Sequence, residues 1–394
     1  MRGDKLESVR RRNLSTVLEL VHQGRAQSRA ELTASTGLNR STIAALVAEL
    51  AALGLVNETA PTASKRVGRP SPRVVPDPGP AVIAVNPELD AITVGVVGLN
   101  ARVEHRVRRE VDHAVSPEEA VAVIAELTDA LRTEIGDERR ILGVGLAVPG
   151  LVRAADGVVR WAPHLGWRET PITRLVEDAV GLPASADNDA SLAAGAERIF
   201  GVGRGVADLV YLNGGASGIG GGVIVRGIPL GGVAGYAGEF GQNRPGLADA
   251  ADRATEHGTL EDEVSRARLL EVLGLHAADE LEFEEALLAS REPKVLVELE
   301  RQQRILAVAL SNAINVLNPE LVVLGGFLAS VHARDPEGLE LLVQRSTVPA
   351  AWEGVRIRRA ALAQDTLLIG AAELAFAPLL RDPAGHSGSA PTTS

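Results

Sequence analysis

The chain has 394 residues and a formal net charge of −11, with 45% hydrophobic and 23% charged residues. This composition is that of an ordinary globular protein, and the length predicts two or three domains. Because the sequence has no cysteine, disulfides, thiolate zinc sites and cysteine nucleophiles are excluded. No apolar run approaches the roughly 20 residues of a membrane span, so we expect a cytoplasmic protein without a membrane partner.

Charge is distributed unevenly along the chain. Residues 1–80 contain 12 Lys and Arg against 7 Asp and Glu, whereas the remaining residues contain 28 against 44. A basic head on an acidic body is typical of a polyanion-binding module joined to a body that avoids nucleic acid. Chance clustering of a few basic residues is the alternative, because the excess is modest.

Three helical segments are predicted in the head. Apolar residues recur at helical spacing between residues 14 and 21. Ser28, with Glu31 three residues later, forms a capping-box pattern that starts a short second helix. Gly37 can take the left-handed conformation of a tight turn, and Asn39 can cap a third helix. This pattern predicts a helix-turn-helix, and an ordinary helical hairpin is the alternative.

The residues after the third helix favour DNA binding over the plain hairpin. The stretch "GLVNETAPTASKRVGRPSPRV" predicts a strand, a basic turn and a second strand, which together form a wing. The "GRP" tripeptide keeps the backbone narrow around Arg69, which suits contact with phosphate or entry into a minor groove. The residues expected to contact DNA are Ser28, Arg29, Asn39, Arg40, Ser41, Thr42, Arg66 and Arg69.

Strands and helices alternate beyond the linker "PDPGP" at residues 76–80. Three consecutive strands are followed by a helix that Ser116 caps, and a buried strand then runs into a turn at Pro149 and Gly150. Later come a strand, a glycine-rich turn and a strand, and then a long helix near 296–317 and a last helix near 367–380. We expect the tail from 381 to 394 to be disordered.

Several motifs occur in a specific order: "VGLAVPGLV", "PHLGW", "DNDASLAAGAE", "GIGGGVI", "GGVAGYAGEFG" and "NPELVVLGG". Together with the head, they resemble the ROK (repressor, ORF, kinase) transcriptional regulators over nearly the whole chain. The resemblance implies an α/β protein, with an N-terminal winged helix-turn-helix followed by a two-lobed actin/hexokinase-like (ribonuclease H-like) ROK body.

The resemblance also implies domain boundaries. The winged helix-turn-helix would span residues 1–78 and the sugar-binding body residues 79–380. Within the body, the small lobe would comprise about 79–190 plus the last helix at about 364–380. The large lobe would span about 191–363.

A sugar presents several hydroxyl groups, so its site needs carboxylates and amides on rigid turns. "DNDAS" supplies Asn188 and Asp189, and the matching aspartate in family kinases contacts the sugar and acts as a general base. An Asx cap for the following helix is the alternative. Glu239 in "GEFG" matches a second sugar carboxylate, and His164 in "PHLGW" is either a sugar ligand or a surface histidine. The full set expected to bind sugar is Pro149, Gly150, His164, Asn188, Asp189, Glu239, Gln242 and Glu261.

In relatives, the loop after "GEFG" contains a histidine and a C-x-C-G-x-x-G-C-x-E pattern that bind structural zinc. Gln242 occupies the histidine position here, and Asp252, Ala254 and Thr259 occupy the cysteine positions. Because a structural zinc needs about four N or S ligands, we expect no metal. A weak site at His257 with nearby acids is possible, although such acids are more often solvated. Glu261 matches the family's third sugar carboxylate, so the loop is expected to keep its ligand role by packing instead.

Family kinases also carry a D-x-G-G-T loop that serves magnesium and phosphates. The matching stretch here is "VNPELDAIT", with Asn86 in place of the aspartate and with Pro87 and Glu88 in the loop. A proline has no N–H to donate, and a glutamate repels phosphate. The later "GASGIGGG" is either a phosphate-type turn or a tight hairpin. We therefore expect neither phosphoryl transfer nor a cofactor.

These observations predict a sugar-responsive transcriptional regulator, a repressor of carbohydrate-metabolism genes. Its partners would be an inverted-repeat DNA operator, a sugar or sugar phosphate, and a second copy in a homodimer or tetramer. One alternative is a regulator with a vestigial sugar pocket that responds to a protein. The other is a sugar kinase with a DNA-binding head.

Overall fold

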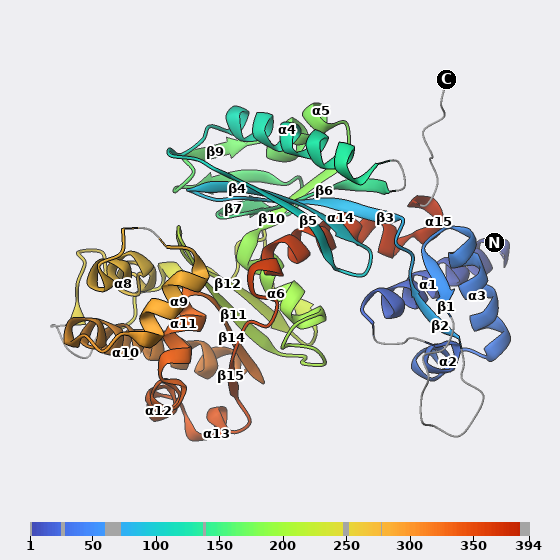
Figure 1. The fold of residues 1–394 in the computed structure, drawn as a ribbon. Helices are drawn as coiled ribbons and strands as arrows, with labels where there is room; N and C mark the ends of the chain where they lie inside the picture. The colour runs from blue at the N-terminus through green and yellow to red at the C-terminus, as the bar shows by residue number, and fades with distance from the viewer. Residues whose placement is uncertain are drawn as a thin grey trace.

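A computed structural model describes residues 2–24, 28–59, 72–136, 139–246, 252–276 and 278–386. The chain forms a head, a first lobe and a second lobe (Figure 1). Arg66 and Arg69, which the sequence predicts to contact DNA, lie outside the described residues.

The head consists of three helices and a two-stranded antiparallel sheet: α1 (Arg2–His22), α2 (Arg29–Thr36), α3 (Arg40–Ala52), β1 (Val56–Thr59) and β2 (Arg73–Pro76). The predicted helix starts are confirmed, because the Ser28 hydroxyl accepts from the N–H of Glu31 at 3.2 Å and Asn39 Oδ1 accepts from the N–H of Thr42 at 2.8 Å. Gly37 ends α2 at a φ of 71°, in the left-handed region that favours glycine.

The first lobe contains a five-stranded sheet, a three-stranded sheet and two helices: β3 (Pro80–Pro87), β4 (Ala91–Gly98), β5 (Val103–Glu110), α4 (Pro117–Ile135), β6 (Arg140–Val148), β7 (Leu151–Arg153), β8 (Val158–Ala162), β9 (Trp167–Thr170), α5 (Ile172–Val180) and β10 (Ala184–Asn188). The larger sheet has the order β10-β6-β3-β4-β5, and β10, β6 and β3 are parallel. Their carboxyl ends therefore meet at one edge, where Asn188, Gly150 and Asn86 lie.

The second lobe is built on a sheet of order β13-β12-β11-β14-β15. Its elements are α6 (Asp189–Ile199), β11 (Leu209–Gly215), β12 (Gly218–Val225), β13 (Ile228–Pro229), η1 (Phe240–Gln242), α7 (Leu260–Glu263), α8 (Arg266–Leu273), α9 (Glu280–Ala289), α10 (Pro293–Leu317), β14 (Leu321–Gly326), α11 (Phe327–Arg334), α12 (Pro336–Ser346), α13 (Pro349–Trp352), β15 (Arg356–Arg359) and η3 (Ala363–Asp365). The glycine-rich turn is a tight hairpin, because β11 and β12 pair as far as Gly215 and Gly218.

Two helices lie between the sheets. Helix α6 packs on the second-lobe sheet, while α14 (Thr366–Arg381) lies under the first-lobe sheet and also against α6 (Figure 1). Glycines permit this close approach. A Cβ on Gly145 of β6 would collide with the carbonyl of Ala371, and one on Gly370 would lie 2.7 Å from the backbone of Leu192.

One helical stretch, Ala363–Arg381, is long and apolar enough to cross a membrane by length and composition alone. Half of its apolar window is buried inside the protein. Its packing against β3, β6 and α6 is that of a core helix, which passes the same test.

The C-terminal segment differs from the predicted disordered tail. Helix α14 continues to Arg381, and a short helix α15 (Pro383–His386) packs against α1. The predicted start of the tail at 381 is therefore too early, because buried contacts such as that of Pro383 hold this segment. Residues 387–394 lie outside the described part.

The head also shares a hydrophobic core with the body. A single buried cluster joins Leu14 and Leu18 of α1 to Phe376 and Leu379 of α14. The head is therefore joined to the body by a packed hydrophobic interface as well as by the predicted linker at 76–80.

Candidate functional site

The amino terminus of α6 carries two polar residues predicted to bind sugar. Asn188 Oδ1 accepts from the N–H of Ser191 at 2.9 Å, so Asn188 is the helix N-cap. Its Nδ2 donates to the carbonyl of Gly150 at 3.1 Å and to Asp189 Oδ1 at 3.2 Å. Asn188 thus caps the helix and also orients Asp189.

The carboxylate of Asp189 is strongly perturbed. Burial raises the pKa of Asp189 to about 7, against the lowering effect of the Ala190 N–H, and the nearby Glu239 charge raises it further. At neutral pH the group exists in both protonation states. It can therefore accept a hydrogen bond from a hydroxyl group or donate one to it.

Glu261 is held in a close-fitting frame. Its Oε2 accepts from the N–H of Ile219 at 3.2 Å, and its Oε1 accepts from Nε2 of Gln242. A Cβ on Gly218 would collide with the Glu261 carboxylate, and one on Gly241 would lie 2.8 Å from it. The glycines of this region therefore allow β12 and η1 to approach the carboxylate.

Glu239 connects these groups electrostatically. Burial and the neighbouring Glu261 raise the pKa of Glu239, and Glu239 in turn raises that of Asp189. Glu239 therefore lies within electrostatic range of both Glu261 and Asp189. We call Gly150, Asn188, Asp189, Glu239, Gln242 and Glu261 the α6 site.

Of the two other residues predicted to bind sugar, Pro149 adjoins the α6 site and His164 has no hydrogen bond to it among the described residues. Pro149 precedes Gly150 at the carboxyl end of β6, where a Cβ on Gly150 would lie 2.6 Å from the carbonyl of Trp161. His164 lies exposed in the turn between β8 and β9. Within the described ranges, no hydrogen bond joins His164 to the α6 site.

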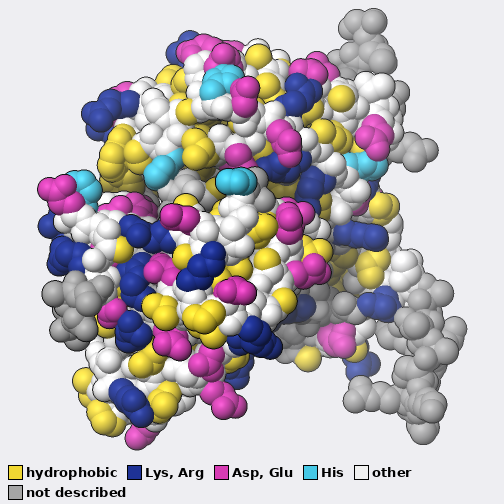
Figure 2. Space-filling view, turned by 60° about the vertical axis from the view of Figure 1, so that its left-hand side comes forward, with side chains coloured by type: hydrophobic (Ala, Val, Ile, Leu, Met, Phe, Trp, Pro, Cys, Tyr) yellow, Lys and Arg dark blue, Asp and Glu magenta, His cyan; other side chains and the backbone are white. Residues whose placement is uncertain are grey.

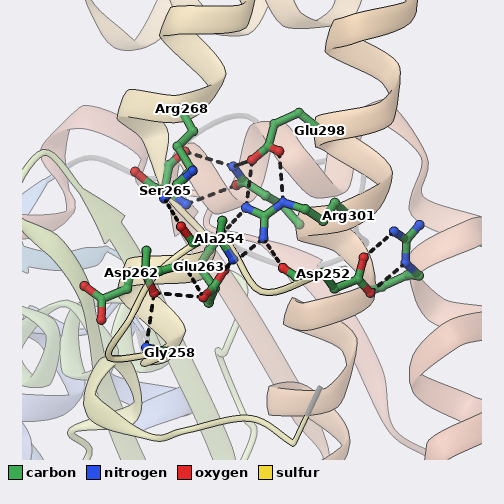
Figure 3. Close-up of polar contacts among 12 residues, drawn as sticks. Asp252, Ala254, Gly258, Asp262, Glu263, Ser265, Arg268, Glu298 and Arg301 are labelled. Carbon is green, nitrogen blue, oxygen red and sulfur yellow. Dashed lines mark hydrogen bonds and ion pairs between the residues drawn. The ribbon is translucent and has the colours of Figure 1, made fainter. Parts of the chain in front are cut away.

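An ion-pair network holds the loop for which the family resemblance implies zinc in relatives (Figure 3). The fully buried Glu263 carboxylate accepts from the N–H groups of Ala254 at 2.8 Å and Thr255 at 3.0 Å, and it pairs with Arg301 of α10 at 3.0 Å. Asp252 also binds α10, through its carbonyl to Arg301 at 2.7 Å and its carboxylate to Arg304 at 2.7 Å.

These contacts use positions that correspond to the family's cysteines. Asp252 and Ala254 belong to the network, and Thr259 instead caps α7 by reciprocal bonds with Asp262. His257 is exposed. Among the described residues, no group of three or more His, Cys, Asp or Glu side chains could hold a metal.

The turn between β3 and β4, residues 86–90, lies at the same sheet edge as Gly150 and Asn188. Asn86 is 3% exposed, and its Oδ1 has no hydrogen-bond partner among the described residues. Burial and Asp90 raise the pKa of Glu88 to about 7, and Asp189 and Glu280 contribute. Glu88 therefore lies within electrostatic range of Asp189. Sequence reasoning missed Glu280, whose proximity arises only because α9 of the second lobe faces this turn.

The face of the head that the sequence predicts to contact DNA carries few long polar side chains on α3. Arg40 is exposed at the start of α3, followed on its outer side by the small residues Ala45 and Ala48. Asn39 Oδ1 accepts from both Ser41 Oγ and the Thr42 N–H, so these groups are used locally.

Two more predicted DNA contacts also have local partners. Ser28 caps α2, and Arg29 makes a two-bond ion pair with Glu58 of β1, each bond 2.7 Å long. Over the body, basic and acidic side chains are interspersed on the face shown in Figure 2.

The ROK family profile matches residues 82–377. The chain belongs to the ROK family. It is 24% identical to a xylose repressor of Caldicellulosiruptor bescii, over 94% of this chain and 97% of that protein. It is 28% identical to a glucokinase of Streptomyces coelicolor, over 67% of this chain and 88% of that enzyme.

A crystal structure of a ROK-family transcriptional regulator, a homologue of the E. coli MLC protein, matches with a TM-score of 0.75 at 20% identity. The match covers 95% of this chain and 97% of that one. The predicted family and fold class are thereby confirmed: a winged helix-turn-helix head precedes a two-lobed actin/hexokinase-like body. The repressor match includes the head, whereas the glucokinase match covers two thirds of the chain.

Proposed function

We propose that this protein is a sugar-responsive DNA-binding repressor of carbohydrate-metabolism genes. The observation that carries the proposal is the retention of the α6 site in a chain that also has a winged helix-turn-helix head. The full-length similarity to a xylose repressor supports it. Such a protein acts in the cytoplasm, where its operator and its sugar meet.

In this proposal, the head binds an inverted-repeat operator as part of a homodimer. Arg40, Ser41 and Thr42 face the major groove, and Arg66 and Arg69 of the wing contact phosphate or the minor groove. Asn39 and Ser28 cap α3 and α2 and thereby fix the two helix starts, whose remaining N–H groups approach phosphates. Arg29 contributes a phosphate contact by exchanging the Glu58 carboxylate for a phosphate oxygen.

The sugar binds at the α6 site between the lobes. Asp189, Glu239 and Glu261 bind ring hydroxyls, and Asn188 and Gln242 orient two of these carboxylates. Pro149 and Gly150 form the adjoining turn, and His164 reaches the ligand only if the β8–β9 turn moves. Binding shifts the closure of the lobes and so the spacing of two heads in a dimer, which is allostery by differential affinity for two arrangements.

A second candidate function is sugar phosphorylation, which the glucokinase similarity and the pKa of Asp189 favour. A general base works best with a pKa near the working pH, and that of Asp189 is about 7. The β3–β4 turn opposes this candidate, because Pro87 has no N–H, Glu88 repels phosphate, and Asn86 replaces the magnesium carboxylate. We therefore propose that the protein is not an enzyme.

We also propose that the sugar loop works without zinc, because the Glu263–Arg301 network holds it. Elemental analysis of purified protein should find no stoichiometric zinc, and a chelator should leave the melting temperature unchanged. Tightly bound zinc would contradict this proposal.

The experiment that tests the main proposal combines two measurements on the full chain. A duplex that binds tightly is selected from a random DNA library, and its affinity is measured with and without D-xylose, D-glucose, D-mannose and N-acetylglucosamine. Calorimetry then tests binding of the same sugars. A sugar that binds and weakens the DNA complex supports the proposal. DNA binding without any sugar binding favours the alternative of a vestigial pocket and a protein signal.

A further inference from the structure

Helix α6 joins the sugar site to the head. Its amino terminus carries Asn188 and Asp189, and its C-cap is Phe200, 11 residues further along. The Phe200 ring packs edge-on against His22, the last residue of α1, with the ring centroids 5.4 Å apart. An 11-residue helix is roughly 16 Å long, so one rigid element spans the distance between the proposed sugar and the DNA-binding head.

His22 is held on all sides by the body. It is 2% exposed, its Nε2 bonds the Glu373 carboxylate of α14 at 2.8 Å, and its Nδ1 bonds the carbonyl of Leu99 after β4. Phe376 of α14 packs against its other side at 5.9 Å. One side chain of the head thus contacts α6, α14 and the first-lobe sheet.

The chemistry of the ring suits this position. Burial alone would lower the pKa of His22, but the Glu373 carboxylate and the Leu99 carbonyl outweigh it and raise the pKa above its ordinary value. Both ring nitrogens face acceptors, and only the doubly protonated ring can donate to both. The ring is therefore fixed in orientation.

A second contact at the same end of α6 reinforces the first. Arg204, four residues after Phe200, donates to the carbonyl of Gln23 at 3.1 Å. The segment at the end of α6 therefore makes two contacts with the end of α1, one through Phe200 and one through Arg204. In contrast, the Arg11–Asp382 pair, which joins α1 to the C-terminal segment, is exposed and 3.5 Å long.

We propose that His22 is the positioning residue through which sugar binding at the α6 site changes the angle of the head. This inference rests on the proposed function and adds the route of coupling. A ligand that draws Asp189 inward displaces α6 as a rigid body, because a packed helix moves as a unit. Phe200 then shifts against the His22 ring, and α1 turns about that ring, because the bonds to Glu373 and Leu99 keep the ring in place as the fixed point. Coupling through such a contiguous packed path requires an element with two arrangements, and α6 is that element.

The test compares the sugar response of operator binding in five full-length proteins: wild type, Phe200→Ala, Phe200→Leu, His22→Gln and the control Arg11→Gln. The response is the ratio of Kd values with and without saturating D-xylose or D-glucose, and typical couplings change Kd by about 5- to 150-fold. We expect Phe200→Ala and His22→Gln to bind sugar by calorimetry but to respond by less than about twofold. Phe200→Leu should retain part of the response, and Arg11→Gln should respond as the wild type does.

Each result has a distinct meaning. A full response in both Phe200→Ala and His22→Gln would overturn the coupling route alone. Loss of sugar binding in Phe200→Ala would also overturn it, since Phe200 would then act on the α6 site itself. A wild-type protein whose DNA binding responds to none of the four sugars of the first experiment would overturn the proposed function, and this inference with it.

A second measurement leaves His22 and Phe200 unchanged, so it does not depend on variants that fail to fold. The sequence has no cysteine, so spin labels can be attached at Ser8→Cys in α1 and Glu118→Cys in α4, both exposed positions. The distance between the labels should change when the sugar saturates the protein. An unchanged distance would overturn the inference.

Discussion

The α6 site and the β3–β4 turn lie at the same edge of the first-lobe sheet, yet they differ in how their polar groups are satisfied. At the α6 site, Asp189 and Glu261 accept backbone N–H bonds and have amide partners. At the turn, Asn86 Oδ1 is buried without a described partner, and Glu88 stands in a cluster of like charge. Although the two regions are adjacent, different elements frame them, so the polar groups of one are satisfied independently of those of the other.

The frame of the α6 site is itself supported by the Glu263–Arg301 network. Removing one partner of a buried ion pair leaves an uncompensated charge and costs about 3–5 kcal/mol. Arg301 keeps a second partner, Glu298 at 2.9 Å, so we expect Glu263→Ala to lower the free energy of unfolding by at most about that amount, measured by urea denaturation. Glu300→Ala, an exposed change on the same helix α10, is the matched control. A loss below about 1 kcal/mol, as for a surface pair, would contradict the role of the network.

The contrast between the two regions is tested by replacing one carboxylate in each of them. Hydrogen bonds to a charged group contribute about 1.5–3 kcal/mol, so Asp189→Ala should weaken sugar binding by roughly ten- to a hundredfold. Glu88→Gln should change the sugar affinity little, because the turn supplies no hydroxyl ligand. Calorimetry with the sugar found in the screen measures both. Equal losses in the two variants would show that the turn is part of the sugar site.

The head is tested by its own pair of substitutions. Arg40→Ala should cost about 1–3 kcal/mol on the selected operator if Arg40 reads a base, with a smaller loss on unrelated DNA. Arg69→Ala should weaken binding on all sequences and reduce the slope of log K against log salt by about one. Gel shifts at several salt concentrations measure both effects. Unchanged affinity in both variants would contradict the winged-helix role.

The pKa of Asp189 predicts a pH dependence of sugar binding. The unfolded carboxyl ionises near its ordinary value of 3.8, whereas the folded group ionises near 7. The folded state thus holds the extra proton between these values, and its stability falls as pH rises through this window.

If the ionised form of Asp189 binds the sugar, the sugar affinity should increase about tenfold between pH 6 and 8. In Asp189→Asn, the sugar affinity measured by calorimetry should not change with pH. In Glu88→Gln, which removes another group that titrates near 7, the affinity should still increase between pH 6 and 8.

For sugar phosphorylation we expect no measurable activity. A coupled ADP-release assay with glucose, mannose, N-acetylglucosamine and xylose should detect no turnover, because the β3–β4 turn offers neither a magnesium carboxylate nor a phosphate cradle. Asn86→Asp alone should not restore activity while Pro87 and Glu88 remain. Turnover on the order of one per second would contradict the proposal that the β3–β4 turn holds neither magnesium nor phosphate.

Features that depend on neighbours along the chain follow directly from the sequence. Ser28, Asn39 and Ser116 each cap a helix whose N–H lies three residues away, so the capping pattern can be read directly from the sequence. Motif order likewise identified the family, and the fold class followed from it. The alternative for Asn188, a helix cap, was also visible, and the side chain does cap α6 while it orients Asp189.

Which distant residues meet depends on the tertiary structure. Arg301 pairs with Glu263 across 38 residues, and Glu373 bonds His22 across 351. No local pattern specifies such pairs, because they arise where α10 crosses the sugar loop and where α14 returns beneath the first-lobe sheet to contact α1. The same return explains why the predicted tail was placed too early: residues 381–386 are ordered by packing against the head, a contact that composition alone does not encode.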